Sequence, residues 1–140
     1  MNPLTVPGQL DFLSQIAQYV LAAAAEANLD KKASYGLRLA VDEIATNIII
    51  HGYEESGIEG DLELRAELSD RNLTIMIEDT AVTYDPIDHP IPDDLEQHPH
   101  EKKIGGLGVY LAIQGVDKFA YERVENRNRN IFTVNRTSHS

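Results

Sequence analysis

LRLAVDEIATNIIIHGY, residues 37–53, is the stretch that decides how the rest of the chain is interpreted. Its large apolar residues recur every three or four positions, as they do on one face of a helix. These residues are Leu37, Val41, Ile44 and Ile48. Small and apolar side chains fill most of the remaining surface, so we expect a helix that is buried on more than one side.

Two polar residues, Glu43 and Asn47, interrupt this apolar helix. Because they are four positions apart, they lie on one face about a turn from each other, away from the apolar stripe. An unpaired buried charge is costly, so a carboxylate and an amide on a largely buried helix favour a polar site between layers of structure. The alternative is a tolerated pair on the protein surface.

Composition limits the classes of function. The chain has 140 residues, which fits one domain over residues 1–140 with a sizeable core. Its 23 acids against 12 bases give a net charge of -11, which argues against binding nucleic acid or an anionic membrane. Residues 101–140 hold more bases than acids, so a phosphate-bearing ligand is expected near their start, or together with a divalent cation. The sequence has no cysteine, membrane-spanning run or signal peptide, and a cytoplasmic location is expected.

The pattern of elements predicts an α+β fold. We expect a largely antiparallel sheet with helices packed on one face, because helices and strands fall in separate runs. Asp30 is the expected N-cap of the helix that ends at Gly52. The other expected helices are 9–27 and 109–115, and the expected strands are 4–6, 61–68, 73–79, 116–124 and 128–135.

A long segment without periodicity, residues 80–104, separates the two hairpins. It holds four prolines and an acidic cluster, and a loop of this length in a compact domain is usually a lid, a binding loop or a disordered insert. Lys102, Lys103 and the glycines of GGLG (105–108) follow it. Glycines that lead into a helix N-terminus expose backbone N–H groups to an anion, so this segment is a candidate phosphate site.

Four segments, taken in chain order, resemble the ATP-binding site of the GHKL superfamily. The resemblance is closer to one branch, the bacterial anti-sigma factor serine/threonine kinases with their histidine-kinase-like ATPase domain. The segments are VDEIATNIIIHGY (41–53), EDTAVTYDP (78–86), GGLGVYLA (105–112) and YERVENRNRNIFTV (121–134). The resemblance covers about residues 4–136, and it implies a two-layer α/β sandwich of the GHKL (Bergerat) type with a mixed, mostly antiparallel sheet.

The resemblance also implies roles for individual residues. Asn47 would be the Mg²⁺ ligand, and Glu43 the general base that accepts a proton from the attacking hydroxyl. Asp79 would accept a hydrogen bond from the exocyclic amine of adenine. Residues 80–104 would form the ATP lid. The other ATP-binding residues that it implies are His51, Ala81 (where the family has glycine), Lys103, Gly105, Gly106, Leu107, Gly108 and Val109.

In this branch the phosphate acceptor is a serine of an anti-sigma antagonist with the STAS fold, and the kinase also binds a sigma factor and forms homodimers in many members. A second interpretation is a protein-binding module without kinase activity, which Ala81 and the acids of the lid favour. A third is a metal hydrolase built on His89, His98 and His100. Their spacing matches no recognised zinc pattern, so a solvated loop is the favoured explanation of these histidines.

Overall fold

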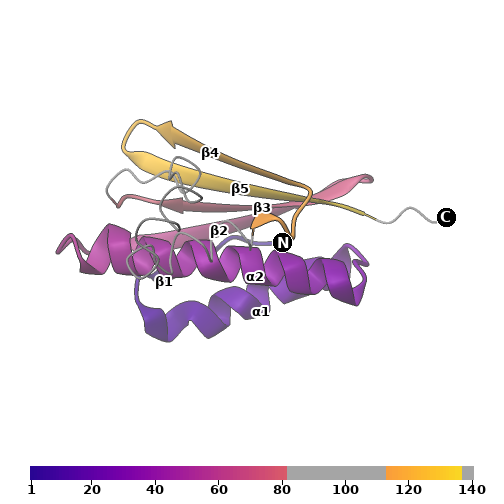
Figure 1. Cartoon of the computed structure of the whole chain (residues 1–140), viewed down its shortest axis with the longest axis horizontal. Helices are drawn as coiled ribbons and strands as arrows, with labels where there is room; N and C mark the ends of the chain where they lie inside the picture. The colour runs from indigo at the N-terminus through magenta and orange to yellow at the C-terminus, as the bar shows by residue number, and fades with distance from the viewer. Residues whose placement is uncertain (82–112, 137–140) are drawn as a thin grey trace, which may run out of the picture.

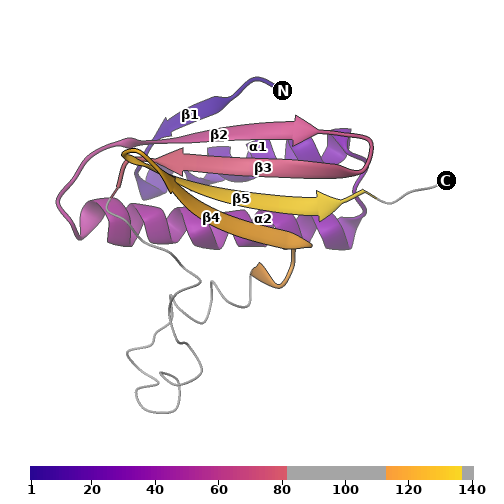
Figure 2. The same ribbon diagram turned by 90° about the horizontal axis from the view of Figure 1, so that it is seen from above.

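The protein, described by a computed structural model over residues 1–81 and 113–136, has a sheet on one side and two long helices on the other (Figure 1). The first half holds β1 (Leu4–Pro7), the 3₁₀ turn η1 (Leu10–Phe12), α1 (Leu13–Glu26), α2 (Lys31–Asn47) and η2 (Ile48–Glu54). The strands β2 (Asp61–Leu68), β3 (Asn72–Asp79), β4 (Lys118–Val124) and β5 (Arg127–Asn135) follow. Both helices cover the same face of the sheet, as the sequence predicts (Figure 2).

The sheet has five strands in the order β1-β2-β3-β5-β4. Every pairing among the described strands is antiparallel, where the resemblance implied a mixed, mostly antiparallel sheet. The short strand β1 lies at one edge and ends in Pro7, a residue that suits an edge because it has no N–H to donate. In the register of β3 and β5, Asp79 lies opposite Asn128 and Glu78 lies opposite Arg129.

The core lies between the sheet and the helices. Burial alternates along the central strands, and the large buried apolar residues lie on the face toward the helices. The fully buried sheet residues include Leu62, Leu64, Leu73, Ile75, Ile77 and Phe132, and the fully buried helix residues include Ile16, Val20, Leu37, Val41, Ile44 and Ile49. The predicted apolar stripe of residues 37–48 is therefore confirmed as the face of α2 and the start of η2 that packs into this core.

Residues 28–30 end the first long helix and start the second. Asn28 adopts a left-handed φ of 59°, and Leu29 N–H donates to the carbonyl of Ala24, which closes the end of α1. Asp30 then accepts a hydrogen bond of 2.8 Å from Ala33 N–H. This confirms Asp30 as the N-cap of α2.

The expected helix end at Gly52 is wrong. Beyond Asn47 the chain continues as the π-helical segment η2 and passes through Gly52 to Glu54. A Cβ at Gly52 would lie 2.7 Å from the Cβ of Ala81, so glycine is needed here for close approach to the segment after β3 and not as a cap. Other boundaries also move: the first long helix begins with η1, β4 begins only at Lys118, and β1, β3 and β5 are each one residue longer than expected.

Within residues 1–81 and 113–136, none of the helices combines the length and the apolar character that a membrane span requires.

Candidate functional site

One face of α2, away from the apolar stripe, carries Gly36, Glu43 and Asn47. Their spacing of seven and eleven residues places all three on one side of a helix. A Cβ at Gly36 would lie 2.6 Å from the carbonyl oxygen of Gly115. The segment that leads into β4 therefore lies directly against this face. Glu43 and Asn47 lie further along the same face, toward η2.

Asn47 is buried, with 5% of its surface exposed, and Glu43 is half-buried beside it. The Nδ2 of Asn47 donates a 2.8 Å hydrogen bond to the backbone carbonyl of Glu43. This bond fixes the orientation of the amide, and no described residue donates to its Oδ1 atom. An anchored neutral amide oxygen is the type of ligand that Mg²⁺ accepts when phosphates and water supply the remaining ligands.

Burial raises the pKa of the Glu43 carboxyl, and the neighbouring charge of Asp42 raises it further. A carboxylate with a raised pKa is a stronger base than an ordinary surface glutamate. Glu43 therefore combines partial access to solvent with a basicity above that of an ordinary surface glutamate.

Asp79 ends β3 with its carboxylate inside the sandwich, only 1% exposed. Its Oδ1 accepts two hydrogen bonds of 2.8 Å, from Ala81 N–H and from Asn128 Nδ2. Its Oδ2 is buried and has no hydrogen-bond partner among the described residues. Burial raises the pKa of this carboxyl, and its hydrogen bonds and the nearby Arg123 offset only part of the effect. Because a buried acceptor without a donor is costly, Oδ2 fits a ligand with an N–H at this position.

Sequence reasoning missed the residues that hold Asp79. Asn128 lies on β5 at 3% exposure, and its Oδ1 accepts from the hydroxyl of Tyr121 and from Arg123 Nη1. The signal was present in the alternation NRN at 128–130. In a strand with period two, Asn128 shares its face with the buried Phe132, so an inward polar side chain could have been expected.

A junction between η2 and the end of β3 connects the polar face of α2 with Asp79. The hydroxyl of Tyr53 accepts a 3.1 Å hydrogen bond from Thr80 N–H and donates one of 2.9 Å to the carbonyl of Asp61. The methyl of Ala81, which is 3% exposed, lies against Gly52. These contacts place the end of α2 and the end of β3 at the same end of the sandwich.

His51 lies in η2, and its Nδ1 is 2.9 Å from Glu55 Oε1. Its side chain is 40% exposed, in contrast to the buried Asn47. The remaining predicted positions lie outside the described residues. These are the residues of the glycine segment (Lys103, Gly105, Gly106, Leu107, Gly108 and Val109), most of the expected lid, and the histidines His89, His98 and His100.

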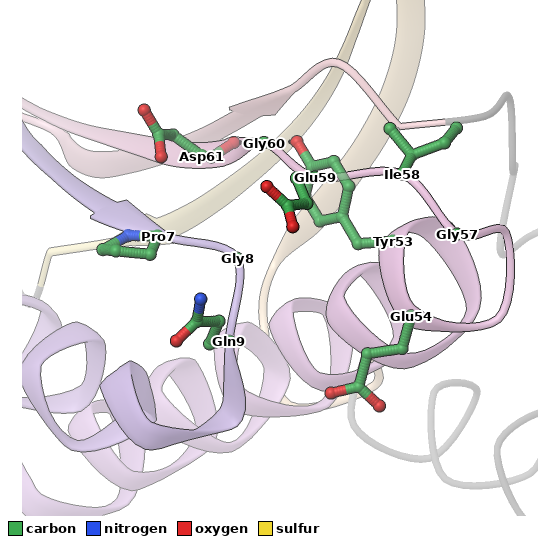
Figure 3. A pocket seen from close by; sticks show the side chains of 10 residues that line it. All are labelled: Pro7, Gly8, Gln9, Tyr53, Glu54, Gly57, Ile58, Glu59, Gly60 and Asp61. Carbon is green, nitrogen blue, oxygen red and sulfur yellow. Dashed lines mark hydrogen bonds between the residues drawn. The ribbon is translucent and has the colours of Figure 1, made fainter.

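An open cavity of about 550 Å³ lies beside Tyr53, where the loop after η2 faces the end of β1 (Figure 3). Its lining includes the acids Glu54, Glu59 and Asp61 and no basic side chain. A smaller cavity of about 370 Å³ lies next to it, between Thr5, Thr80 and Arg127. None of Glu43, Asn47 and Asp79 lines either cavity, so both are separate from the predicted site.

The fold is that of an ATPase-type α/β sandwich, and comparison with known proteins agrees. A family model for the histidine kinase-like ATPase domain matches residues 6–134. The chain belongs to this family, which confirms the family and the two-layer fold predicted from the sequence.

Two curated relatives are similar over most of the chain. The anti-sigma F factor of Clostridium kluyveri is 30% identical over 91 residues, which are 65% of this chain and 62% of that protein. The match therefore spans less than two thirds of that relative's length. The serine-protein kinase RsbW of Halalkalibacterium halodurans is 27% identical over 125 residues, which are 82% of this chain and 71% of that protein.

A solved structure agrees with the fold. The histidine kinase domain from the Erythrobacter litoralis EL346 blue-light activated histidine kinase superposes with a TM-score of 0.55. The superposition covers 90% of this chain and 60% of that domain, at 18% sequence identity. At this identity the likeness supports the fold alone.

Proposed function

We propose that this protein binds ATP with Mg²⁺ and transfers the γ-phosphoryl group to a serine of an anti-sigma antagonist of the STAS type. It would also bind a sigma factor, form a homodimer and act in the cytoplasm. Its similarity to an anti-sigma F factor and to a serine-protein kinase supports this proposal. So does its membership of the histidine kinase-like ATPase family.

The observation that carries the proposal is the buried carboxylate of Asp79 with one unpartnered oxygen, at the end of the sandwich where η2 meets β3. A carboxylate that only accepts hydrogen bonds suits the exocyclic amine of adenine. Asn47, with its amide nitrogen already engaged, suits a Mg²⁺ ion. These features fit a purine triphosphate with its metal ion better than a purely structural polar cluster.

In the reaction, bound ATP supplies the phosphoryl group. The serine oxygen of the antagonist forms the new bond to phosphorus while the bond to the ADP oxygen breaks, and Glu43 accepts the proton of the serine hydroxyl. The raised pKa of Glu43 favours this step, because the base is matched more closely to neutral pH than an ordinary glutamate. The remaining task of the chain is to position the groups and to balance their charge.

A phosphoryl-transfer assay tests the proposal. The protein is incubated with γ-labelled ATP, Mg²⁺ and a candidate STAS antagonist, and the label on the antagonist is measured for the native chain and for Glu43→Gln. We expect transfer to fall by about 10²–10⁴-fold in Glu43→Gln, with ATP binding retained. Equal transfer by both proteins would show that Glu43 is not the base.

The second candidate function is a protein-binding module without kinase activity. It is favoured by the acids Asp88, Asp93, Asp94 and Glu96, which lie outside the described residues and would repel a triphosphate if they faced it. Ala81 supports it less, because the methyl lies against Gly52 in a contact that accommodates it. An antagonist that forms a tight complex with the protein but remains unlabelled in the assay would support this candidate.

A further inference from the structure

We propose that Asn128, held in place by Arg123, is a positioning residue that orients Asp79 and thereby sets the selectivity for adenine over other purines. The inference rests on the proposed function, because it concerns the base of the nucleotide that Asp79 would accept. It adds two residues of the β4–β5 hairpin to a site that sequence reasoning built from α2, β3 and the glycine segment.

The hydrogen bonds of Asn128 fix which way its amide points. Its Nδ2 donates to Asp79 Oδ1 at 2.8 Å and to the carbonyl of Ala81 at 3.1 Å, so both of its hydrogens are used. Its Oδ1 accepts from Tyr121 and from Arg123, at 3.0 Å in the case of Arg123. A flipped amide would place a donor against these two donors and an oxygen against the Asp79 carboxylate, so only one orientation is stable.

This orientation makes the two oxygens of Asp79 different. Both protein donors, Ala81 N–H and Asn128 Nδ2, converge on Oδ1. The other oxygen, Oδ2, is left as a buried acceptor without a donor in the described part of the chain. An acceptor-only atom attracts the 6-amino group of adenine and repels the 6-oxo group of guanine or hypoxanthine. The selectivity therefore depends on Asn128 and Ala81 engaging Oδ1, so that Oδ2 remains the oxygen that faces the purine base.

Arg123 secures the arrangement from the neighbouring strand. Its Nη1 lies 3.0 Å from Asn128 Oδ1 and 3.3 Å from the carbonyl of Ala81. The guanidinium has only donors, so it keeps the oxygen of the Asn128 amide turned toward itself. Loss of Arg123 would remove one of the two donors described for that oxygen and would weaken the constraint on the amide orientation.

The test compares ATP with the triphosphate of purine riboside, which lacks only the 6-amino group. Affinities of the full-length protein for both are measured by calorimetry with Mg²⁺ present. For the native chain we expect ATP to bind about 10–100-fold more tightly, the range for a buried hydrogen bond to a charged group. In Asn128→Ala the ratio should fall to about 3 or less, and in Arg123→Gln it should be intermediate.

Arg136→Gln is the matched control, because Arg136 also donates to backbone carbonyls, those of Ala27 and Ser69, but does not contact Asp79 or Asn128. It should keep the native ratio. A purely structural role for Asn128 would weaken both nucleotides equally, so an unchanged ratio in Asn128→Ala and Arg123→Gln overturns the inference while the proposed function stands. If the native chain bound neither nucleotide, the proposed function would fail and the inference with it.

Discussion

At the scale of single residues, the informative feature is a carboxylate whose two oxygens have different surroundings. Asp79 is 1% exposed, yet only its Oδ1 is hydrogen-bonded by described residues. A residue that served stability alone would have both oxygens satisfied, because an unpaired buried oxygen is costly. The arrangement is typical of a binding site, where the partner of the free oxygen is a ligand.

Asp79→Asn should separate binding from stability. Burial raises the pKa of Asp79 in the folded protein, so its ionisation opposes folding, and this penalty grows as pH rises from the ordinary aspartate range through the raised value. The neutral asparagine should therefore be at least as stable as the native chain at pH 7 in urea unfolding. ATP affinity should nevertheless fall about 10–100-fold.

The comparison at acid pH is the control for Asp79→Asn. Below the ordinary aspartate pKa both proteins are neutral at this position, so any stability advantage of the variant should disappear there. Unchanged ATP affinity in the variant would show that Asp79 does not contact the base.

Glu43 gives a prediction about pH. Because its pKa is raised by burial and by Asp42, the rate of phosphoryl transfer should fall on acidification at a pH above the ordinary glutamate range. The rate is measured at saturating ATP between pH 4.5 and 8. In Asp42→Asn the midpoint should move to lower pH, since one of the two causes is removed. A midpoint that stays fixed in Asp42→Asn would assign the titration to another group.

At the scale of elements, the connection between η2 and the end of β3 depends on one glycine and one alanine. A Cβ at Gly52 would lie 2.7 Å from the Ala81 Cβ, a separation that side chains do not tolerate. Gly52→Ala should therefore lower the free energy of unfolding by about 1–3 kcal/mol. Chemical denaturation measures the change.

A double-mutant cycle isolates this contact. Gly52→Ala combined with Ala81→Gly moves the methyl from one side of the contact to the other, so the double variant should recover most of the stability lost by Gly52→Ala alone. Additive losses in the double variant would mean that the destabilisation arises elsewhere in η2.

The outer face of the sheet holds β3 and β5 in the register that brings Asp79 opposite Asn128. Glu78 accepts hydrogen bonds from Arg127 at 3.0 Å and from Arg129 at 2.7 Å. Partial burial acts to raise the pKa of Glu78, but the two arginines outweigh it and the pKa is lowered. Glu78 therefore stabilises the fold above the ordinary glutamate pKa, and this contribution is lost as pH falls through the lowered value.

Glu78→Gln should accordingly destabilise the protein at pH 7 by about 1 kcal/mol, a value reduced by the solvent exposure of both arginines. The difference from the native chain should shrink below about pH 4. Glu67→Gln, at an exposed position of β2, is the matched control and should have little effect. A loss in Glu78→Gln that is independent of pH would contradict the assignment.

The sequence predicted these elements well where periodicity was strong and poorly where close packing decided the outcome. The stripe of α2 and the alternation of β2 and β3 follow from burial patterns that each strand or helix shows on its own. The π-helical passage through Gly52 does not, because it depends on Ala81, a residue 29 positions away. Asn128 was missed for the same reason, since its role comes from its pairing with Asp79 across two strands.

At the scale of the whole molecule, the net charge of -11 is the main obstacle to binding a triphosphate. Like charges raise the free energy of a bound polyanion, and a divalent cation reduces that repulsion. The described part of the site contributes a neutral amide, Asn47, and the carboxylate Glu43 to the face of α2. The chain is therefore expected to bind ATP chiefly as its Mg²⁺ complex.

Thermal unfolding with and without Mg²⁺ measures this dependence for the whole chain. A ligand that binds only the folded state, present at about 100 times its Kd, stabilises the protein by about 2.7 kcal/mol. With ATP and Mg²⁺ the native chain should show a stabilisation of this order, and chelation of Mg²⁺ by EDTA should remove most of it. In Asn47→Ala, ATP should stabilise the protein equally weakly with and without Mg²⁺. An equal stabilisation of the native chain in EDTA would mean that nucleotide binding does not use the metal ion, and that Asn47 has another role.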